Sequence, residues 1–410
     1  MGDIAVPPGI ICTAEQYSRM LSGDASIHCL TRTESIGLTV VTEIGLVSLF
    51  AVCYVFFIIA RNVIQHIRHT PDGKISIVQE PMDIFMASPC RFDIYVHLVY
   101  QTLHALQLSL FIADFIQALG AVMDIKWIHE GKVEIGNFCT AQGVIQQLGE
   151  TGVAITTLLI AIYTFIGVWW RIGMGQKSVR VAKIIIGLVW SFVFLMIVLG
   201  NAIHADKSKL YQSPTPYWCW IGNEYLQWRI WGEYVWFWIT LAFSSFAYTL
   251  LFFWSRGNIT LDEYSWWKFS IHRASKFDAH QTTRMQSLVM LAYPIVYSVL
   301  IMPLSIVRWI GFVQERGDGV NTIGAAPVML VIGIYGLSGA ANVVLLLTTR
   351  PNSVLFGHPV DYTPRVSRPS ASMSTNAPLT MYKTNSVSEM EGEPSNDLGR
   401  LPSRSSAGWP

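Results

Sequence analysis

Charged residues are scarce in this sequence. They make up 13% of the 410 residues, whereas 52% of the residues are hydrophobic; a soluble domain carries about 25% charged residues. The scarcity is concentrated, because residues 44–60 and 184–203 contain no Asp, Glu, Lys or Arg. A helix of roughly 20 apolar residues is long enough to cross a bilayer core of about 30 Å. The composition therefore excludes a soluble protein and indicates a polytopic membrane protein.

Motifs of enzymes and pumps are also missing. The ten histidines form no H-E-x-x-H motif, and no His and Asp residues are spaced as metal ligands within the apolar segments. We therefore expect no enzyme activity, no metal, no cofactor and no nucleic-acid partner. A retinal-binding pump would need a lysine in the last apolar segment, and residues 323–348 contain none.

Seven apolar segments are long enough to cross a membrane: residues 36–60, 95–125, 138–170, 181–203, 229–254, 285–312 and 323–348. Each is predicted to be a helix, because backbone polar groups in hydrocarbon need partners within their own segment. The predicted fold class is an all-α membrane protein with a seven-transmembrane helix bundle. We divide the chain into an N-terminal tail with no evident domain (1–35), the seven-helix domain (36–350) and a tail (351–410) whose polar composition predicts disorder.

Lys and Arg set the predicted orientation, because they concentrate on the cytoplasmic side of membrane proteins. With the N-terminus outside, the inner loops hold more of them than the outer loops do. We therefore place the N-terminus outside and the C-terminus in the cytoplasm. No signal peptide is recognisable, because residues 4–12 are short and interrupted by Pro7 and Pro8; the first helix is expected to insert as its own signal.

Four of the six cysteines fall on the predicted outer side, where oxidising conditions favour disulfides. They are Cys12, Cys29, Cys139 and Cys219. Cys219 lies within YWCWIG (217–222), in the outer loop after the fourth segment. A bond from Cys139 to Cys219 would fold this loop across the mouth of the bundle. Four cysteines allow three pairings, so the residues alone leave the choice open.

Ionisable residues at membrane depth are costly and face the bundle interior, which makes them functional candidates. In the second segment this residue is Asp114, in the run FIADFIQ. In the third segment Gln142, Gln146 and Glu150 follow Cys139 at spacings of three, four and four residues, and so they share one helical face.

Polar residues also share a face in the fifth and sixth segments. Glu233, Thr240 and Ser244 line up in the fifth, and Tyr297 and Arg308 line up in the sixth. If the polar faces of the third, fifth and sixth segments converge beneath the outer loop, they form a ligand pocket, and this is what we predict. Alternatively, Arg308 and Glu233 simply pair with each other as an interhelical lock.

Two further patterns concern packing. Trp218 and Trp220 are expected to anchor the outer loop at the headgroup level, and Trp220 is also assigned to the ligand pocket. Pro294 and Pro303 predict a bent sixth helix, because proline removes a backbone donor and clashes with the preceding turn. Glycines of the seventh segment would allow that helix to pack closely beside the sixth; they are Gly333, Gly336 and Gly339.

Several motifs resemble those of one receptor family. A cysteine opening the third helix and another between the fourth and fifth look like a G-protein-coupled receptor. The form WCWI (218–221) resembles the cyclic-AMP-receptor-like family of slime moulds and fungi, which includes fungal receptors linked to glucose sensing. The remaining matches, within residues 36–351, are Tyr225, Arg229-Ile230, Tyr234, LSLFIADFIQALG (108–120), YPIVYSVLIMPLSIVRW (293–309) and NVVLLLTTRP (342–351).

The resemblance implies a Cys139–Cys219 disulfide, leaving Cys12 and Cys29 to pair with each other or not. It also implies a sixth helix that swings outward and a heterotrimeric G protein (Gα) as partner. Basic residues at the inner ends are assigned to that contact, although positive-inside topology and anionic lipid explain most of them as well: Arg171, Lys177, Arg180, Arg256, Arg284 and Arg350. The acidic–arginine–aromatic triplet of the largest receptor class is absent.

The resemblance also gives Asp114 an expected partner. In seven-helix receptors an acid in a run like FIADFIQ commonly joins a polar network with the seventh helix, and the resemblance implies Asn342 as the partner here. The network is either a switch or a static contact.

Together these patterns predict a plasma-membrane receptor that senses a small polar ligand, such as a sugar, a cyclic nucleotide or another nutrient, and feeds cAMP signalling. Kinases or arrestin-like proteins are expected partners of the tail. The lipid bilayer is the expected partner of the helices. The alternative is a transporter of a small polar solute. Against it, the sequence shows no related halves, no discontinuous helix pair and an odd number of spans.

Overall fold

The computed structural model describes residues 6–69, 93–169, 176–204, 211–256, 258–261, 269–271, 281–317 and 323–349. The chain divides into two units, Met1–Val360 and Asp361–Pro410, and every described residue belongs to the first. The predicted tail over 351–410 lies outside the described residues, so its disorder stays a prediction.

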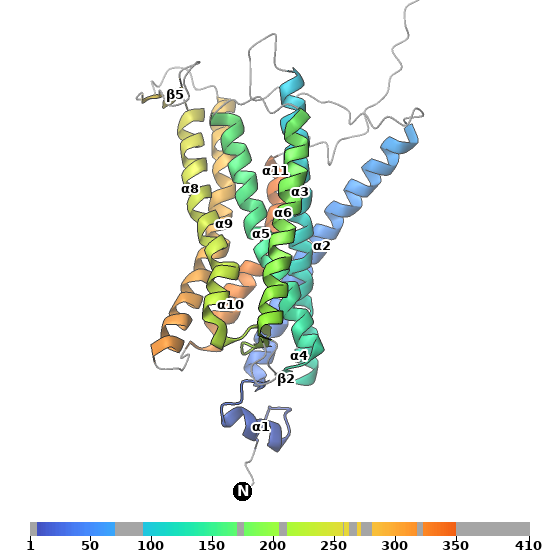
Figure 1. The fold of residues 1–410 in the computed structure, drawn as a ribbon, viewed down its shortest axis with the longest axis vertical. Helices are drawn as coiled ribbons and strands as arrows, with labels where there is room; N and C mark the ends of the chain where they lie inside the picture. Colours follow the sequence, from blue (N-terminus) through green and yellow to red (C-terminus); the bar gives the residue numbers. More distant parts are fainter. Residues whose placement is uncertain are drawn as a thin grey trace, which may run out of the picture. The chain divides into compact units, whose positions relative to one another are not determined.

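Among the described residues, seven helices are long and apolar enough to cross a membrane, which confirms the predicted number. In Figure 1 these helices run side by side, and α5 packs against α3, α6 and α8. The spanning elements are α2 (Arg32–His69), α3 (Asp93–Val122) with the short α4 (Ile125–Glu130), α5 (Asn137–Trp169), α6 (Gln176–Ile203), η1 (Asn223–Tyr225) to α8 (Val235–Ser255), α9 (Gln281–Gly317), and α10 (Ala325–Gly336) with α11 (Ser338–Thr349).

Glycine lets α3 and α5 approach closely. A Cβ at Gly149 of α5 would lie 2.4 Å from the backbone nitrogen of Gln117, and a Cβ at Gly120 of α3 would lie 2.8 Å from Cγ of Gln146. Real Cβ atoms do not tolerate such distances, because interiors are close-packed. The two glycines therefore bring the polar side chains of α3 and α5 onto one shared interior surface.

The seventh span is broken, contrary to the prediction of continuous helices. The helix α10 ends at Gly336, Leu337 forms a turn, and α11 begins at Ser338. A break leaves backbone groups without helical partners. Ser48 of α2 satisfies two of them: its hydroxyl donates to the Gly336 carbonyl, and its oxygen accepts from the Ala340 N–H at 3.3 Å.

The glycines of the seventh span face α2 and not, as expected, the sixth span. A Cβ at Gly333 would meet Ile44 at 3.1 Å, and a Cβ at Gly339 would meet Val52 at 3.2 Å. The sixth span, α9, is a single helix with Pro294 and Pro303 inside it; its bend stays a prediction.

The N-terminal segment, predicted as a tail with no evident domain, contains two short elements of secondary structure. It contains α1 (Ala14–Leu21) and strand β1 (Ile27–Cys29), which pairs antiparallel with β2 (Lys132–Glu134). Thr13 and Gln16 form a capping box at the start of α1. A disulfide joins Cys12 to Cys29, a pairing that the sequence left open.

Two short hairpins complete the fold. Strands β3 (Gln212–Pro214) and β4 (Cys219–Ile221) pair beside β2, and strands β5 (Ile259–Leu261) and β6 (Phe269–Ile271) pair with each other. In Figure 1, α1, β2 and α4 lie at one end of the helices and β5 lies at the other. We call residues 211–222, which contain β3 and β4, the outer hairpin, after the side of the membrane on which the sequence predicts them to lie.

Candidate functional site

The outer hairpin is fastened to the start of α5. A disulfide joins Cys139 to Cys219 with the Cα atoms 5.1 Å apart, and this is the pair that the family resemblance implied. Among the described residues Cys53 is the one free cysteine. All three residues of β4 are buried, so the outer hairpin is packed among the helix ends and is not a loose loop.

Gln142 is a structural residue of this attachment. Its Oε1 accepts from the indole N–H of Trp127 at 2.6 Å and from the backbone N–H of Cys219 at 3.1 Å. Its Nε2 donates to Asp124 Oδ1 at 2.6 Å and to the Gly120 carbonyl at 3.4 Å. Gln142 was predicted to contact ligand, but it does not line the cavity described next, and both of its polar atoms are bonded within the protein.

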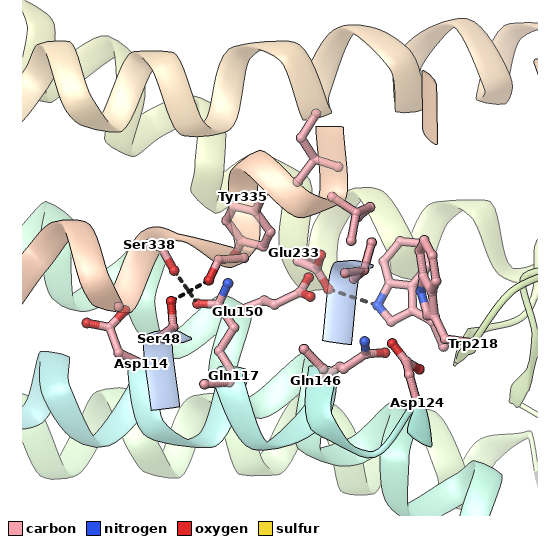
Figure 2. Close-up of a pocket in the computed structure, with 18 of the residues that line it drawn as sticks. Ser48, Asp114, Gln117, Asp124, Gln146, Glu150, Trp218, Glu233, Tyr335 and Ser338 are labelled. Carbon is pink, nitrogen blue, oxygen red and sulfur yellow. Dashed lines mark hydrogen bonds between the residues drawn. The ribbon is translucent and has the colours of Figure 1, made fainter. Parts of the chain in front are cut away.

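A cavity of about 40 Å³ lies between the outer hairpin and the break in the seventh span, with room for roughly three water molecules. Figure 2 shows Trp218 at one end of it and Asp114 at the other. Of the predicted ligand contacts, Tyr297 is buried elsewhere, and five line the cavity: Gln146, Glu150, Trp220, Glu233 and Arg308.

The two ends of the cavity differ, and we name them separately. The outer chamber lies beneath the outer hairpin and consists of Gln146, Glu150, Trp218, Trp220, Glu233, Tyr234 and Arg308. The inner network lies at the break in the seventh span and consists of Ser48, Asp114, Gln117, Ser338 and Asn342.

Glu150 and Glu233 face each other in the outer chamber. Both side chains line the cavity, and in Figure 2 the Glu150 side chain points toward Glu233. Trp220 donates its indole N–H to Glu233 Oε2 at 3.0 Å. An ionised carboxylate only accepts hydrogen bonds, so a bond between the two acids requires one proton.

A π-helical turn places Glu233 in the interior. This turn, η2 (Ile230–Tyr234), immediately precedes α8, and such turns disturb the regular helical register, often at functional sites. The hydroxyl of Thr151 on α5 donates to the Gly232 carbonyl within the turn at 3.1 Å. Glu233 is thereby 1% exposed. The predicted face-sharing of Glu233 with Thr240 assumed regular helical spacing; Thr240 instead bonds the Ala154 carbonyl at 3.0 Å.

Arg308 stacks on the outer hairpin. Its guanidinium carbon lies 5.3 Å from the ring centroid of Trp218 and 5.4 Å from that of Trp220, which is cation–π distance. Within the part of the chain that the structure describes, Arg308 has no salt bridge, so the proposed lock with Glu233 is not found. Both tryptophans therefore anchor the outer hairpin and line the cavity.

Arg229 is a second cation at the hairpin, and its burial was not predicted from the sequence. It is 1% exposed, its Nε donates to the Ile221 carbonyl at 2.8 Å, and its guanidinium lies 4.9 Å from the Trp220 ring centroid. Arg229 therefore supports β4 and Trp220 from the beginning of the fifth span.

Several buried polar atoms of residues that line the cavity have no hydrogen-bond partner among the described residues. They are Oδ1 of Asp114, Oε1 of Gln146, Nε of Arg308 and the hydroxyl of Tyr335. Buried polar groups are nearly always bonded to protein or to another molecule. These atoms belong to four different helices, so a molecule that satisfies them contacts several helices together.

The inner network contains the predicted contact between the second and seventh spans. Asn342 donates to Asp114 Oδ2 at 2.9 Å. Ser338 donates to Gln117 Oε1 at 3.0 Å, a contact that the sequence did not reveal. Periodicity within one segment could not identify Gln117, Ser48 or Ser338, because each owes its role to the break in the seventh span.

The outer hairpin carries neutral tyrosines outside the spans. Burial raises the pKa of Tyr217 to about 12, with the negative charge of Glu34 adding to the shift, and burial also raises the pKa of Tyr211. His28 of β1 packs edge-on against Tyr217 at 5.7 Å between ring centroids. The N-terminal segment therefore covers an uncharged surface of the outer hairpin.

Most of the predicted G-protein contacts have side chains that the structure does not describe. Arg171 and Arg350 are not among the described residues, and the side chains of Lys177 and Arg284 are not described. The side chains of the other two, Arg180 and Arg256, are exposed, and the Arg256 guanidinium lies 5.6 Å from the Phe252 ring centroid.

The polar cavity is thus the principal candidate site. In the described residues no three His, Cys, Asp or Glu side chains come together as metal ligands. The carboxyl, amide and guanidinium groups of the outer chamber are suited to hydrogen bonding and charge pairing with a small organic molecule. In comparisons with known proteins, the sequence matches no protein-family model and no curated protein.

Proposed function

We propose that this chain is a seven-transmembrane receptor of the plasma membrane, with its N-terminus outside, that binds a small polar ligand and activates a heterotrimeric G protein. One observation carries the proposal: a cavity with unpartnered polar atoms lies directly beneath a hairpin fastened by the Cys139–Cys219 disulfide. A few convergent polar groups in a pre-formed cavity are usual in small-molecule sites, and the volume of about 40 Å³ limits the ligand to a very small molecule or head group.

The lining residues supply a route from ligand to helix movement. Glu150 belongs to α5, Glu233 to the turn before α8 and Arg308 to α9, so a ligand that bonds all three fixes the outer ends of these helices together. A ligand shifts a conformational equilibrium only by its difference in affinity for the two states. Pro294 and Pro303 lie inside α9, and each removes a backbone hydrogen bond from the helix. Because these positions bend more easily, we expect the cytoplasmic half of α9 to move.

A transporter is the second candidate, and one observation favours it. The seventh span is interrupted at Leu337, next to the polar residues of the inner network, and discontinuous helices bordering a polar site occur in many transporters. The same break also suits a receptor, because it provides a point at which α10 and α11 can move separately.

One experiment separates the two functions. The full-length chain, purified into lipid nanodiscs, is mixed with a panel of Gα subunits, and nucleotide exchange is measured with sugars, cyclic nucleotides, amino acids and amines. We expect at least one compound to accelerate exchange by about tenfold or more, and an Arg308→Ala variant to lose most of that response.

Solute flux is measured in parallel on the same protein in sealed vesicles. Concentrative uptake of a solute without any stimulated exchange would establish the transporter and reject the receptor. Glu15→Ala serves as the matched control, because Glu15 is exposed on α1, outside the candidate spans, and does not line the cavity.

A further inference from the structure

The outer chamber has one negative charge more than it has positive charges. When ionised, Glu150 and Glu233 contribute two negative charges and Arg308 contributes one positive charge. Glu233 is 1% exposed, and an uncompensated charge in such surroundings is expensive. One proton on either acid would relieve the excess. A ligand with a single positive charge would relieve it equally and let both acids ionise.

Arg308 does not already fill this role. Its guanidinium lies over the rings of Trp218 and Trp220, and no acid of the described chain is within salt-bridge distance of it. The facing Glu150 and Glu233 carboxyls therefore have no cation of the described protein in direct contact. The stack leaves Arg308 close enough to influence both acids through space.

Hydrogen-bond counting points to a particular cation. A primary ammonium group has three N–H donors and no acceptor. Three acceptors line this part of the cavity: the Glu150 carboxylate, the Glu233 carboxylate and Oε1 of Gln146. Gln146 is 8% exposed, and its Oε1 has no partner among the described residues. It precedes Glu150 by four residues on α5, so the two side chains are neighbours on one helical face.

The walls of the chamber also suit an ammonium group. Trp220 and Tyr234 line the cavity together with the acids, and aromatic rings attract cations. A cavity of about 40 Å³ is large enough for a small head group without major rearrangement. An anionic ligand would meet two carboxylates and one guanidinium that is already stacked, so the chamber disfavours it.

We propose that the outer chamber binds a small protonated primary amine, with the ammonium group held by Glu150, Glu233 and the side-chain oxygen of Gln146. This inference rests on the proposed function, because it names the ligand class of the same cavity. It departs from the sugar and cyclic-nucleotide classes that the sequence suggested.

The test uses the full chain in lipid nanodiscs and three probes of nearly equal size: propylamine, 1-propanol and propionate. Binding is measured as a shift in thermal unfolding, with sodium chloride added so that every sample has the same ionic strength. We expect propylamine, at millimolar concentration, to raise the unfolding temperature, and the alcohol and the acid to have no effect. Glu233→Gln and Glu150→Gln should each weaken propylamine binding by at least tenfold.

Glu15→Gln is the matched control, because it makes the same chemical change on α1, where Glu15 is exposed and lies outside the candidate spans; this variant should bind propylamine like the unaltered chain. If Glu233→Gln fails to fold, the comparison of propylamine, 1-propanol and propionate on the unaltered chain still tests whether the chamber prefers an amine. Stabilisation by propionate or 1-propanol equal to that by propylamine overturns the proposal, and so does stabilisation by sodium chloride alone.

Failure of this inference is distinguishable from failure of the proposed function. Amine binding without stimulated nucleotide exchange on any Gα supports the amine site and rejects the receptor. Stimulated exchange by a sugar or an anion, with no binding of propylamine, supports the receptor and rejects the amine site.

Discussion

The outer chamber and the inner network are parts of one cavity, but they accommodate buried polar groups differently. In the inner network a single acid, Asp114, receives a hydrogen bond from an amide, and a hydroxyl bonds another amide. In the outer chamber two acids face each other, and the nearby guanidinium stacks on tryptophan rings. The inner network has a single acid among neutral amide and hydroxyl groups, whereas the outer chamber places two acids on one cavity wall. Two facing acids offer a cation two carboxylates at once, so the outer chamber is the better candidate for binding a charged ligand.

The two regions are also held in place by different means. The outer chamber depends on a disulfide between residues 80 apart in sequence and on a hairpin packed into the helix ends. The inner network depends on Ser48 bridging the broken seventh span and on glycine contacts of that span with α2. Changes in one region should therefore leave the other largely intact.

The largest effect is expected from Cys219→Ser. This variant releases the outer hairpin from α5, so the outer chamber loses its cover and the ligand response is abolished. For a loop of 80 residues the lost stabilisation is about 4–5 kcal/mol. Ligand-stimulated nucleotide exchange on Gα, normalised to the amount of receptor at the cell surface, measures the effect.

The control for this variant is the double change Cys12→Ser, Cys29→Ser. That disulfide spans only 17 residues and lies in the N-terminal segment, so ligand potency should change by no more than about threefold. A well-expressed Cys219→Ser protein with a full response would contradict the role given to the outer hairpin.

An intermediate effect is expected from Trp220→Phe. The substitution keeps an aromatic ring but removes the N–H that bonds Glu233 at 3.0 Å. A hydrogen bond to a charged group contributes about 1.5–3 kcal/mol, so we expect ligand affinity to fall by roughly tenfold or more. Affinity is measured by the thermal shift of the purified protein across a ligand titration.

Ser338→Ala is the comparison from the inner network. It removes one hydrogen bond between neutral groups, which contributes about 1 kcal/mol. We expect a small loss of stability and an altered basal rate of nucleotide exchange, with ligand affinity within about twofold. A larger fall in affinity for Ser338→Ala than for Trp220→Phe would contradict the assignment of ligand binding to the outer chamber.

The smallest effect concerns acid pH and the N-terminal segment. Hydrogen bonds from Ser26 lower the pKa of Asp24 below its ordinary value of 3.8. The ionised acid therefore stabilises this turn above pH 3.8, and the stabilisation is lost as the pH falls below that value through the lowered pKa. Amide hydrogen exchange of the segment, compared between neutral and acid pH, measures the loss; Asp24→Asn should remove its pH dependence and leave ligand affinity unchanged.

Much of the molecule follows from local patterns in the sequence. Runs without charge predicted the spans, because a helix is the structure that pairs its own backbone groups in hydrocarbon. The regular spacing of Gln146 and Glu150 correctly placed both on the interior face of α5. The contact between Asp114 and Asn342 is also found, as the resemblance to seven-helix receptors implied.

Other features depended on contacts between distant segments. The π-helical turn that points Glu233 toward Glu150, the stacking of Arg308 on the outer hairpin and the break supported by Ser48 are not visible in any single segment. Periodicity arguments assume an uninterrupted helix and treat each segment alone. By itself, then, the sequence determined which segments enter the membrane and which polar residues face inward. Only the tertiary structure decided which of those residues meet, because that depends on helix interruptions and close packing between residues far apart in the chain.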